Sequence, residues 1–378
     1  MTFTVRPARE DDAEALADLS HEAFGYPRQE ARSPLAEGRS TIVATDGVRV
    51  VGSATCHRYD SWWWGQTLPT AGIAGVKVAS EARGSGLVRR LIEPLLEEAR
   101  GWGAVVSTLF ATAPAIYRPL GYEVVATYDD ETVVPTAVFR DLAPGPDALR
   151  RAVPDDLPAI VDAYEAWARQ HNGPLTRRGP LFPADRAFTG GAYTLAEREG
   201  RVTGVLRWDR TSRYGEPEST LEVHDFIALD AGAAASLLTS LGSHSAVAPR
   251  TVVSTSGLDA LHLLVPSWQW QRGSGSPYSL AVLEPAAVVR RRAYPAWTSL
   301  GTTFGVDDRA WSVRISRGAA TVDPTDEVPA VRFTPRGFAA VWSGSQSLAA
   351  VRQMGLAEGH DDLWWLFGAG QVHIRDYF

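Results

Sequence analysis

Short apolar runs and wider, helix-like spacings of apolar residues alternate along this chain. The two patterns meet without a spacer in the stretch VKVASEARGSGLVRRL, residues 76–91. Alternating apolar positions over residues 70–79 predict a strand. From Leu87 the apolar residues fall at positions 87, 88, 91, 92, 95, 96 and 99, which is the stripe of an amphipathic helix. The pattern therefore predicts a strand and a helix joined by a tight, glycine-containing loop at residues 83–86.

Two parts of the chain repeat one order of elements. RPAREDD at residues 6–12 and RRAVPDD at residues 150–156 each predict a short strand and an Asp pair able to cap a following amphipathic helix. TIVATDGVRVVG (41–52) and YTLAEREGRVTG (193–204) each predict a hairpin. The offsets of 144 and 152 residues indicate a duplicated domain, and they disfavour chance similarity between strand–helix starts.

The second copy and the rest of the chain lack the glycine loop. FIALDAGAAASLLTSLGS (226–243) again predicts a strand followed by a helix, but without Arg-Gly-x-Gly. A third region starts near residue 290 and combines a strand pair, WSVRISRGAATV, with helical spacing in FTPRGFAAVWSG and SLAAVRQMGLAEGH. We therefore expect an α/β fold with mixed sheets in three domains, residues 1–145, 146–288 and 289–378.

Composition excludes several classes of protein. The 378 residues are 45 % hydrophobic with a net charge of −7, so no basic footprint for nucleic acid is present. The N-terminal residues lack the apolar core of a signal peptide, and no window reaches the length of a membrane span, so we expect a soluble, cytoplasmic protein with no membrane partner. The single cysteine, Cys56, rules out an internal disulfide or a thiolate zinc cluster, and we expect no metal.

The loop at residues 83–86 has the chemistry of an anion site. The first backbone N–H groups of a helix lack intrahelical partners, and glycine lets a phosphate approach them closely. Arg83 can add charge-assisted hydrogen bonds. Two nucleotide motifs are excluded, because no GxxxxGK[ST] loop is present and Arg89 stands where GxGxxG needs its third glycine. A Gly-x-Gly turn with no ligand remains the alternative.

The downstream sequence narrows this choice. AVVSTLF (104–110) predicts a second buried strand, and ATAPAIYRPLGYEVV predicts a short helix carrying Tyr117 and a turn at Gly121-Tyr122. This order resembles the Gcn5-related N-acetyltransferase (GNAT) superfamily, whose signature is a strand, an Arg/Gln-x-x-Gly-x-Gly/Ala loop, a helix, a strand and a Tyr-x-x-x-Gly-Tyr/Phe segment. Val88 stands in the last loop slot instead of Gly or Ala, whereas the tyrosine segment is intact.

The resemblance implies an acetyl-CoA site and a general acid. In that superfamily the loop amides hold the coenzyme A pyrophosphate and the preceding strand pairs with the pantetheine arm. The residues implied here are Val76, Lys77, Val78, Arg83, Gly84, Ser85, Gly86, Leu87, Val88, Arg89, Thr112 and Ala113. Tyr117 matches the tyrosine that protonates the departing sulfur, which suits a phenol of pKa near 10. A core tyrosine with a satisfied hydroxyl is the alternative.

The whole chain resembles the Eis (enhanced intracellular survival) family of acetyltransferases. That family combines an active copy, a degenerate copy and a sterol-carrier-like C-terminal domain, and it forms hexamers. The resemblance implies a homohexamer, and it implies that the carboxylate of the last residue, Phe378, is the general base. A terminus anchored only for packing is the alternative, and His373 is another candidate base, although the alternation in VHIR predicts that it faces solvent.

The acceptor is expected to be a primary amine of a small molecule, either aminoglycoside-like, as in antibiotic modification, or aromatic and apolar. The aromatic residues expected around its pocket are Phe24, Tyr26, Trp62, Trp63, Trp64 and Tyr377. A subunit contact is the alternative for the three tryptophans. A different class also stays open, namely a non-catalytic protein that binds acyl-CoA or a lipid through its C-terminal domain.

Overall fold

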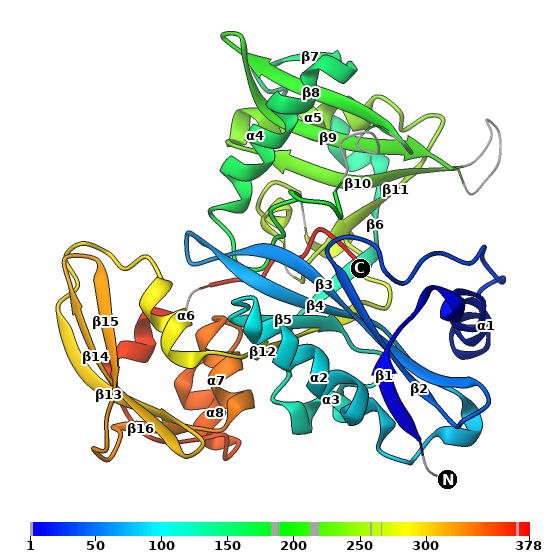
Figure 1. The fold of residues 1–378 in the computed structure, drawn as a ribbon. Coiled ribbons are helices and arrows are strands. Elements are labelled where there is room, and N and C mark those ends of the chain that lie inside the picture. The colour runs from blue at the N-terminus through cyan, green and yellow to red at the C-terminus, as the bar shows by residue number, and fades with distance from the viewer. Residues whose placement is uncertain are drawn as a thin grey trace.

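The computed structural model describes residues 3–182, 188, 190–211, 219–257, 259–265, 267–367 and 370–378. The chain forms three lobes (Figure 1): the first copy with the N-terminus, the second copy above it, and the C-terminal region to one side. In the part of the chain described, no helix is long and apolar enough to span a membrane.

The elements follow the predicted order closely. The strands are β1 (Thr4–Pro7), β2 (Arg39–Thr45), β3 (Val50–Trp63), β4 (Gln66–Val78), β5 (Val106–Phe110), β6 (Glu123–Pro135), β7 (Ala148–Arg151), β8 (Ala192–Arg198), β9 (Arg201–Arg210), β10 (Thr220–Ala228), β11 (Arg250–Thr255), β12 (Ser276–Val282), β13 (Leu300–Val306), β14 (Arg309–Ser316), β15 (Ala319–Pro324), β16 (Val331–Phe333) and β17 (Ala357–Gly359). The α-helices are α1 (Ala13–Phe24), α2 (Leu87–Gly101), α3 (Pro114–Tyr117), α4 (Leu157–Ala168), α5 (Ala231–Gly242), α6 (Pro285–Arg291), α7 (Pro335–Trp342) and α8 (Leu348–Gln353). Both predicted hairpins are confirmed as β2–β3 and β8–β9.

One mixed sheet runs through both copies. Its order is β1-β2-β3-β4-β5-β12-β6-β11-β10-β9-β8-β7. β12 comes late in the chain, yet it lies between β5 and β6 and pairs antiparallel with both. β6 pairs with β12 along its first half and with β11 along its second half. The two copies therefore share strands and form one continuous β-structure (Figure 1).

The start of each copy has the same local geometry. Arg6 donates two hydrogen bonds to Asp12, at 2.7 and 2.8 Å, and Arg150 donates two to Asp156, at 2.6 and 2.7 Å. Each carboxylate also accepts a hydrogen bond from a backbone N–H three residues earlier. Asp12 and Asp156 therefore cap the 3-10 turns that lead into the two helices, through the N–H groups of Arg9 and Val153, and do not cap α1 and α4 themselves.

The C-terminal region has its own sheet and an aromatic core. The sheet order is β15-β14-β13-β16-β17. Trp342, Phe338 and Trp364 are almost fully buried in its interior, together with Phe304, Phe333, Trp311 and Phe367. The region docks on the first copy through α7, where Arg336 donates a 2.8 Å hydrogen bond to Glu123 of β6. This buried cluster continues into the first copy through Trp63, Leu68 and Val106, so the two regions share one apolar core.

Candidate active site

The predicted strand–loop–helix junction is confirmed as β4, a short 3-10 turn at Ser80–Ala82, the loop at residues 83–86, and α2. α2 packs its apolar stripe, including Leu91, Ile92 and Leu95, on one face of the first copy's sheet. α1 covers the opposite face. The residues of the junction therefore lie at the C-terminal end of β4, between two helical layers.

The N-terminus of α2 is open. Gly86 is its N-cap residue, adopts a left-handed conformation (φ 76°) and offers the helix no side-chain cap. Gly84 is also left-handed, and a Cβ at either glycine would meet nothing within 4 Å. The free N–H groups of the first turn thus face open space, which suits an anion.

The other loop side chains do not close this space. Arg83 is exposed and donates a 3.3 Å hydrogen bond to the Val78 carbonyl, and Ser85 donates to Ala82. Arg89 points along the helix and pairs with Glu93 at 2.6 Å, so it is engaged away from the loop. The remaining predicted cofactor residues lie where expected: Val76, Lys77 and Val78 end β4, Leu87 and Val88 begin α2, and Thr112 and Ala113 follow β5.

The matching helix of the second copy is closed. α5 begins after Asp230, whose carboxylate accepts a 2.9 Å hydrogen bond from the Ala233 N–H. Arg198 donates two 3.0 Å hydrogen bonds to the same carboxylate. Asp230 thus places a negative charge where the open helix of the first copy can accept one from a ligand.

β4 and β5 pair only at the start of their common length and then separate. The parallel ladder between them covers only Thr70, Ala71 and Gly72 of β4. A register shift between β3 and β4 and a left-handed Gly75 follow at once. β4 therefore turns away from β5, so its backbone edge from Ile73 to Val78 is left without the β5 ladder and leads toward the open end of α2. An extended, amide-containing arm can pair with such an edge.

Tyr117 lies in α3 with its ring in the first copy's core. It is 8 % exposed and contacts Tyr122 edge to face, at 6.2 Å between ring centroids. Its hydroxyl makes no hydrogen bond to any residue that the structure describes, whereas the Tyr122 hydroxyl lies 2.6 Å from Ser107 Oγ. Burial raises the pKa of Tyr117. The Tyr117 phenol is therefore protonated and available to a new partner.

The Phe378 ring lies on the face of β3 and β4 opposite to α2. It contacts Tyr59, Phe110 and His57 at centroid distances of 5.1, 5.4 and 6.3 Å. It also lies over Gly72, where an added Cβ would come within 2.9 Å of the ring. The end of the chain therefore sits where β4 and β5 begin to separate, between the first and second copies (Figure 1). The terminal carboxylate forms no ion pair with a described residue.

The preceding tail residues bind the second copy. Arg177 Nε lies 2.9 and 3.1 Å from the two carboxylate oxygens of Asp376, and Arg177 also pairs with Asp225 of β10. Arg375 donates to the Ser254 carbonyl at 2.8 Å and to Asp259 at 3.0 Å. The second copy thus positions the end of the chain over the first.

His373 does not face solvent, so that prediction is wrong. It is 4 % exposed, and its ring contacts His171 at 4.4 Å and Trp167 at 6.0 Å. Burial lowers its pKa to about 3. The strand alternation does not apply because the tail is covered on both sides by the second copy and the C-terminal region.

A cavity of about 360 Å³ lies on the α1 face of the sheet, and His57 in its lining contacts the Phe378 ring at 6.3 Å between centroids. Phe24 and Tyr26 line it, as predicted for the substrate pocket. Its polar lining was not singled out from the sequence: Ser20, Arg39, Thr41, Ser53, Thr55, His57 and the side chain of Lys77. These positions alternate along β2, β3 and β4, so a pattern of polar residues on one strand face was the available signal. Burial, with Arg39 nearby, lowers the pKa of His57 to about 4.

The three tryptophans do not line this cavity, and that prediction is corrected. Trp62 packs with Trp167 of α4, and Trp63 contacts Trp342 in a tilted arrangement, at 5.1 Å between ring centroids. Trp64 donates a 2.8 Å hydrogen bond to the Trp342 carbonyl. The β3–β4 hairpin reaches the junction of all three lobes, so these rings fill contacts within one chain. Tyr377 stacks on Phe110 at 4.2 Å, beside Phe378.

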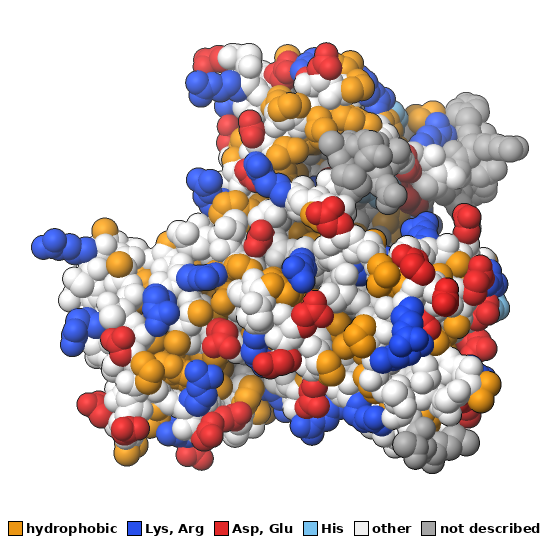
Figure 2. All heavy atoms as spheres, in the orientation of Figure 1, with side chains coloured by type: hydrophobic (Ala, Val, Ile, Leu, Met, Phe, Trp, Pro, Cys, Tyr) orange, Lys and Arg blue, Asp and Glu red, His pale blue; other side chains and the backbone are white. Residues whose placement is uncertain are grey.

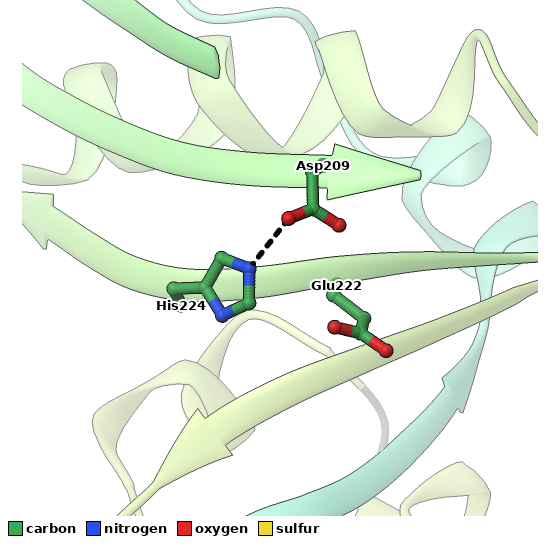
Figure 3. Close-up of side chains that lie close together, drawn as sticks. All are labelled: Asp209, Glu222 and His224. Carbon is green, nitrogen blue, oxygen red and sulfur yellow. Dashed lines mark hydrogen bonds and ion pairs between the residues drawn. The ribbon is translucent and has the colours of Figure 1, made fainter. Parts of the chain in front are cut away.

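One group of side chains in the second copy has metal-ligating types. Asp209 of β9 pairs with His224 of β10 at 3.0 Å, and Glu222 stands beside them (Figure 3), with ligand atoms all within 4.8 Å of one another. All three are half-buried. The Asp–His hydrogen bond accounts for the approach of two of them. The group lies in the second copy, away from the α2 loop, and the expectation of no metal stays a prediction.

The sequence matches two domains of one family. Residues 4–125 match an acetyltransferase (GNAT) domain, and residues 165–290 match a second acetyltransferase (GNAT) domain. An uncharacterized N-acetyltransferase of Streptomyces avermitilis is 31 % identical over 263 residues, which are 63 % of each chain. One of Streptomyces coelicolor is 31 % identical over 191 residues, 46 % of this chain and 45 % of its own. The alignments thus span less than two thirds of these relatives.

Solved structures share the fold over the full length. A GCN5-related N-acetyltransferase of Anabaena variabilis superposes with a TM-score of 0.87 at 19 % identity, covering 100 % of both chains. One of Kribbella flavida gives 0.80 at 24 % identity, covering 100 % of this chain and 98 % of its own. Eis1 of Mycobacterium abscessus gives 0.78 at 19 % identity over 100 % of both. The predicted fold class is confirmed, and the chain belongs to the GNAT acetyltransferase family, with two GNAT domains in tandem.

Proposed function

We propose that the protein transfers the acetyl group of acetyl-CoA to a primary amine of a small molecule, and that it does so in the first copy alone. The observation that carries this proposal is the contrast between two helix starts. α2 begins at an uncapped glycine, whereas α5 begins under the carboxylate of Asp230. Of these two matching helix starts, the one in the first copy has free amides for a diphosphate and the one in the second copy does not.

The first copy's own residues fit acetyl-CoA. The N–H groups around Gly84 and Gly86 would hold the diphosphate, and the edge of β4 from Ile73 to Val78 would pair with the pantetheine arm. Bound there, acetyl-CoA supplies an activated acetyl group. The first copy's separated strands lead this arm toward Gly72, where the end of the chain lies.

Tyr117 acts as the general acid in this proposal. Its hydroxyl is protonated at neutral pH and has no competing partner among the residues described. It can give its proton to the sulfur as the carbon–sulfur bond breaks, which avoids release of a free thiolate.

The carboxylate of Phe378 acts as the general base. A free α-carboxylate in water has a pKa of about 3.3–3.7, which is too low for efficient removal of a proton from an ammonium group, so this role requires that the bound substrate exclude water from the carboxylate. The tail contacts at Arg177 and Arg375 support this role, because they hold the chain end over Gly72. The amine nitrogen, once deprotonated, attacks the acetyl carbon.

The competing proposal of a lipid-binding C-terminal domain has less support. The interior of that domain is filled by aromatic side chains such as Trp342, Phe338 and Trp364. A lipid carrier needs a cavity of its own, and ligand sites in proteins are concave.

We also propose the Eis-type assembly, a hexamer. Trp268 and Trp297 are 81 % and 78 % exposed in one chain, and a subunit contact would cover such apolar surface.

Release of free thiol from acetyl-CoA tests the proposed function. The purified chain is mixed with acetyl-CoA and each member of an amine panel, and the thiol is measured with a colorimetric reagent. Amine-dependent release that Tyr117→Phe slows supports acetyl transfer. No release with any amine, from a folded protein that binds acetyl-CoA, would favour the non-catalytic alternative.

A further inference from the structure

Lys77 is the only lysine of the chain, and the other 36 of the 37 Lys and Arg residues are arginines. An ammonium is a compact charge with three donors on a flexible stem, whereas a guanidinium is a planar fork. Lys77 lies on β4, beside the predicted cofactor site. Its side chain, however, extends to the opposite face of the sheet, into the cavity under α1.

The ammonium of Lys77 has one neutral partner, the hydroxyl of Ser20 on α1. It forms no ion pair with any residue in the described part of the chain. Burial lowers its pKa to about 8, so it is still mostly protonated at neutral pH. A half-buried cation without a counter-charge is costly, and an anion that reached it would remove much of that cost.

The rest of the cavity adds positive charge. Glu30 and Arg32 line it from exposed positions, where their opposite charges offset each other. Arg39 is half-buried, its Nε has no hydrogen-bond partner, and it makes no ion pair with a described residue. Lys77 and Arg39 are therefore the half-buried charges of the lining, and no carboxylate of a described residue, that of Phe378 included, forms an ion pair with either of them. Such a lining disfavours a polycation such as an aminoglycoside and favours an anion.

Lys77 lies away from the proposed reacting end. Phe378 sits over Gly72, and Lys77 follows five residues later on β4, at most about 17 Å along the strand at 3.3 Å per residue. The lysine side chain can shorten this gap. A substrate whose amine lies near Phe378 would thus reach Lys77 only with a group several bonds away from its amine.

We propose that the acceptor is an amine that also carries a carboxylate several bonds from the amine, and that Lys77 binds this carboxylate within the cavity. This inference rests on the proposed acetyl transfer at the same site. It assigns to Lys77 a role in substrate recognition that is separate from the backbone contacts of β4 with acetyl-CoA. Arg39 contributes to the positive potential of the cavity.

Three matched pairs of probes test the inference: 4-aminobutyrate, 6-aminohexanoate and 4-(aminomethyl)benzoate, each against its primary carboxamide. Since the chain has one lysine, isotopic labelling of lysine gives a single side-chain signal in NMR. At least one carboxylate should shift this signal and raise the pKa of Lys77, while its carboxamide should not. If no carboxylate acts on the signal more strongly than its amide, the inference is overturned, whether or not the protein transfers acetyl groups.

Kinetics of the same pairs give the second arm. With thiol release as the readout, the wild-type protein should prefer the carboxylate over the amide by roughly ten- to a hundredfold in kcat/KM, the range of a charged hydrogen bond. Lys77→Met should abolish the preference and Lys77→Arg should keep part of it. Gly86→Asp is the control for the NMR experiment. It should abolish acetyl-CoA binding but leave the shift of the Lys77 signal by the carboxylate probe unchanged. A loss of acetyl-CoA affinity in Lys77→Met would overturn the inference by assigning the lysine to the cofactor.

Discussion

Arg177 of the second copy holds Asp376, two residues before the end of the chain, through contacts of 2.9 and 3.1 Å from one guanidinium nitrogen. Asp225 holds the other side of the same guanidinium. Both partners are largely buried, at 23 % and 17 % side-chain exposure. The second copy has its own helix start capped by Asp230, and this pair ties it to the face of the first copy where we propose the active site. The degenerate copy therefore has a positioning role in our account.

Asp376→Asn should release the tail and reduce turnover without affecting acetyl-CoA affinity. Removing one partner of a buried pair costs about 3 kcal/mol or more, and Arg177 would keep only Asp225. The control is Asp156→Asn, which breaks the similar bidentate pair with Arg150 at the start of the same copy. Steady-state kinetics and calorimetric titration measure the two quantities. Equal kinetic losses in both variants would argue for general destabilisation instead of tail positioning.

A glycine added after Phe378 should remove general base catalysis. It turns the Phe378 carboxylate into an amide and moves the negative charge by about 3.5 Å. Turnover should fall by roughly 100- to 10,000-fold, the usual contribution of such a group, while acetyl-CoA binding persists. An N-terminally tagged protein with and without the extra glycine gives the comparison. Unchanged turnover would return the role to a side chain, although His373 is too deeply buried to be the first choice.

Tyr117→Phe should slow the reaction and leave the fold intact. The hydroxyl has no hydrogen-bond partner in the described structure, so its removal breaks no internal contact. A loss of kcat by roughly 100-fold or more, with unchanged acetyl-CoA affinity and unchanged Tm, fits an acid that acts on the departing sulfur. Tyr122→Phe is the stability control, because it removes the hydroxyl next to Ser107 at 2.6 Å. If Tyr117→Phe retains full kcat, another proton donor must be sought.

His57 should make the fold less stable in mild acid. Its pKa is about 6.5 in the unfolded chain and about 4 in the folded one, so the unfolded state binds more protons between these values. Stability is therefore lost as pH falls from 6.5 to 4, by about 3 kcal/mol from this residue. Urea unfolding at several pH values should show a weaker pH dependence in His57→Gln, and no change in the exposed control His360→Gln. An identical pH slope in His57→Gln and the wild-type protein would contradict the assignment.

Local patterns predicted local structure well. The strand, loop and helix around residues 83–86, both hairpins and the repeated Arg–Asp start all follow from short-range periodicity and turn residues. The insertion of β12 between β5 and β6 does not, because no periodicity specifies which distant strand a β-strand pairs with. Figure 2 shows positive and negative side chains interspersed over one face of the molecule. Net charge is a sum over all such groups, so it does not reveal that Lys77 lies in the cavity under α1 without an ion pair.

The errors at the site have one physical origin. The strand alternation predicts that His373 faces solvent, and Trp62, Trp63 and Trp64 are expected around the acceptor pocket, but the lobes cover these residues from several sides. Phe24 and Tyr26 line the cavity under α1, whereas Tyr377 stacks on Phe110 and does not line it.

Calorimetric titration of acetyl-CoA into matched glycine variants tests the central claim most directly. Gly86 and Gly200 share a left-handed backbone, at φ 76° and 73°, and a Cβ at either meets nothing within 4 Å, so aspartate strains both equally. Gly232 is a poorer control, since its Cβ would come within 2.6 Å of Arg198. Gly86→Asp places a carboxylate at the start of α2, as Asp230 does at α5, and should abolish binding. We predict one acetyl-CoA per wild-type chain, one per Gly200→Asp chain and none per Gly86→Asp chain. Binding that survives in folded Gly86→Asp would contradict the account.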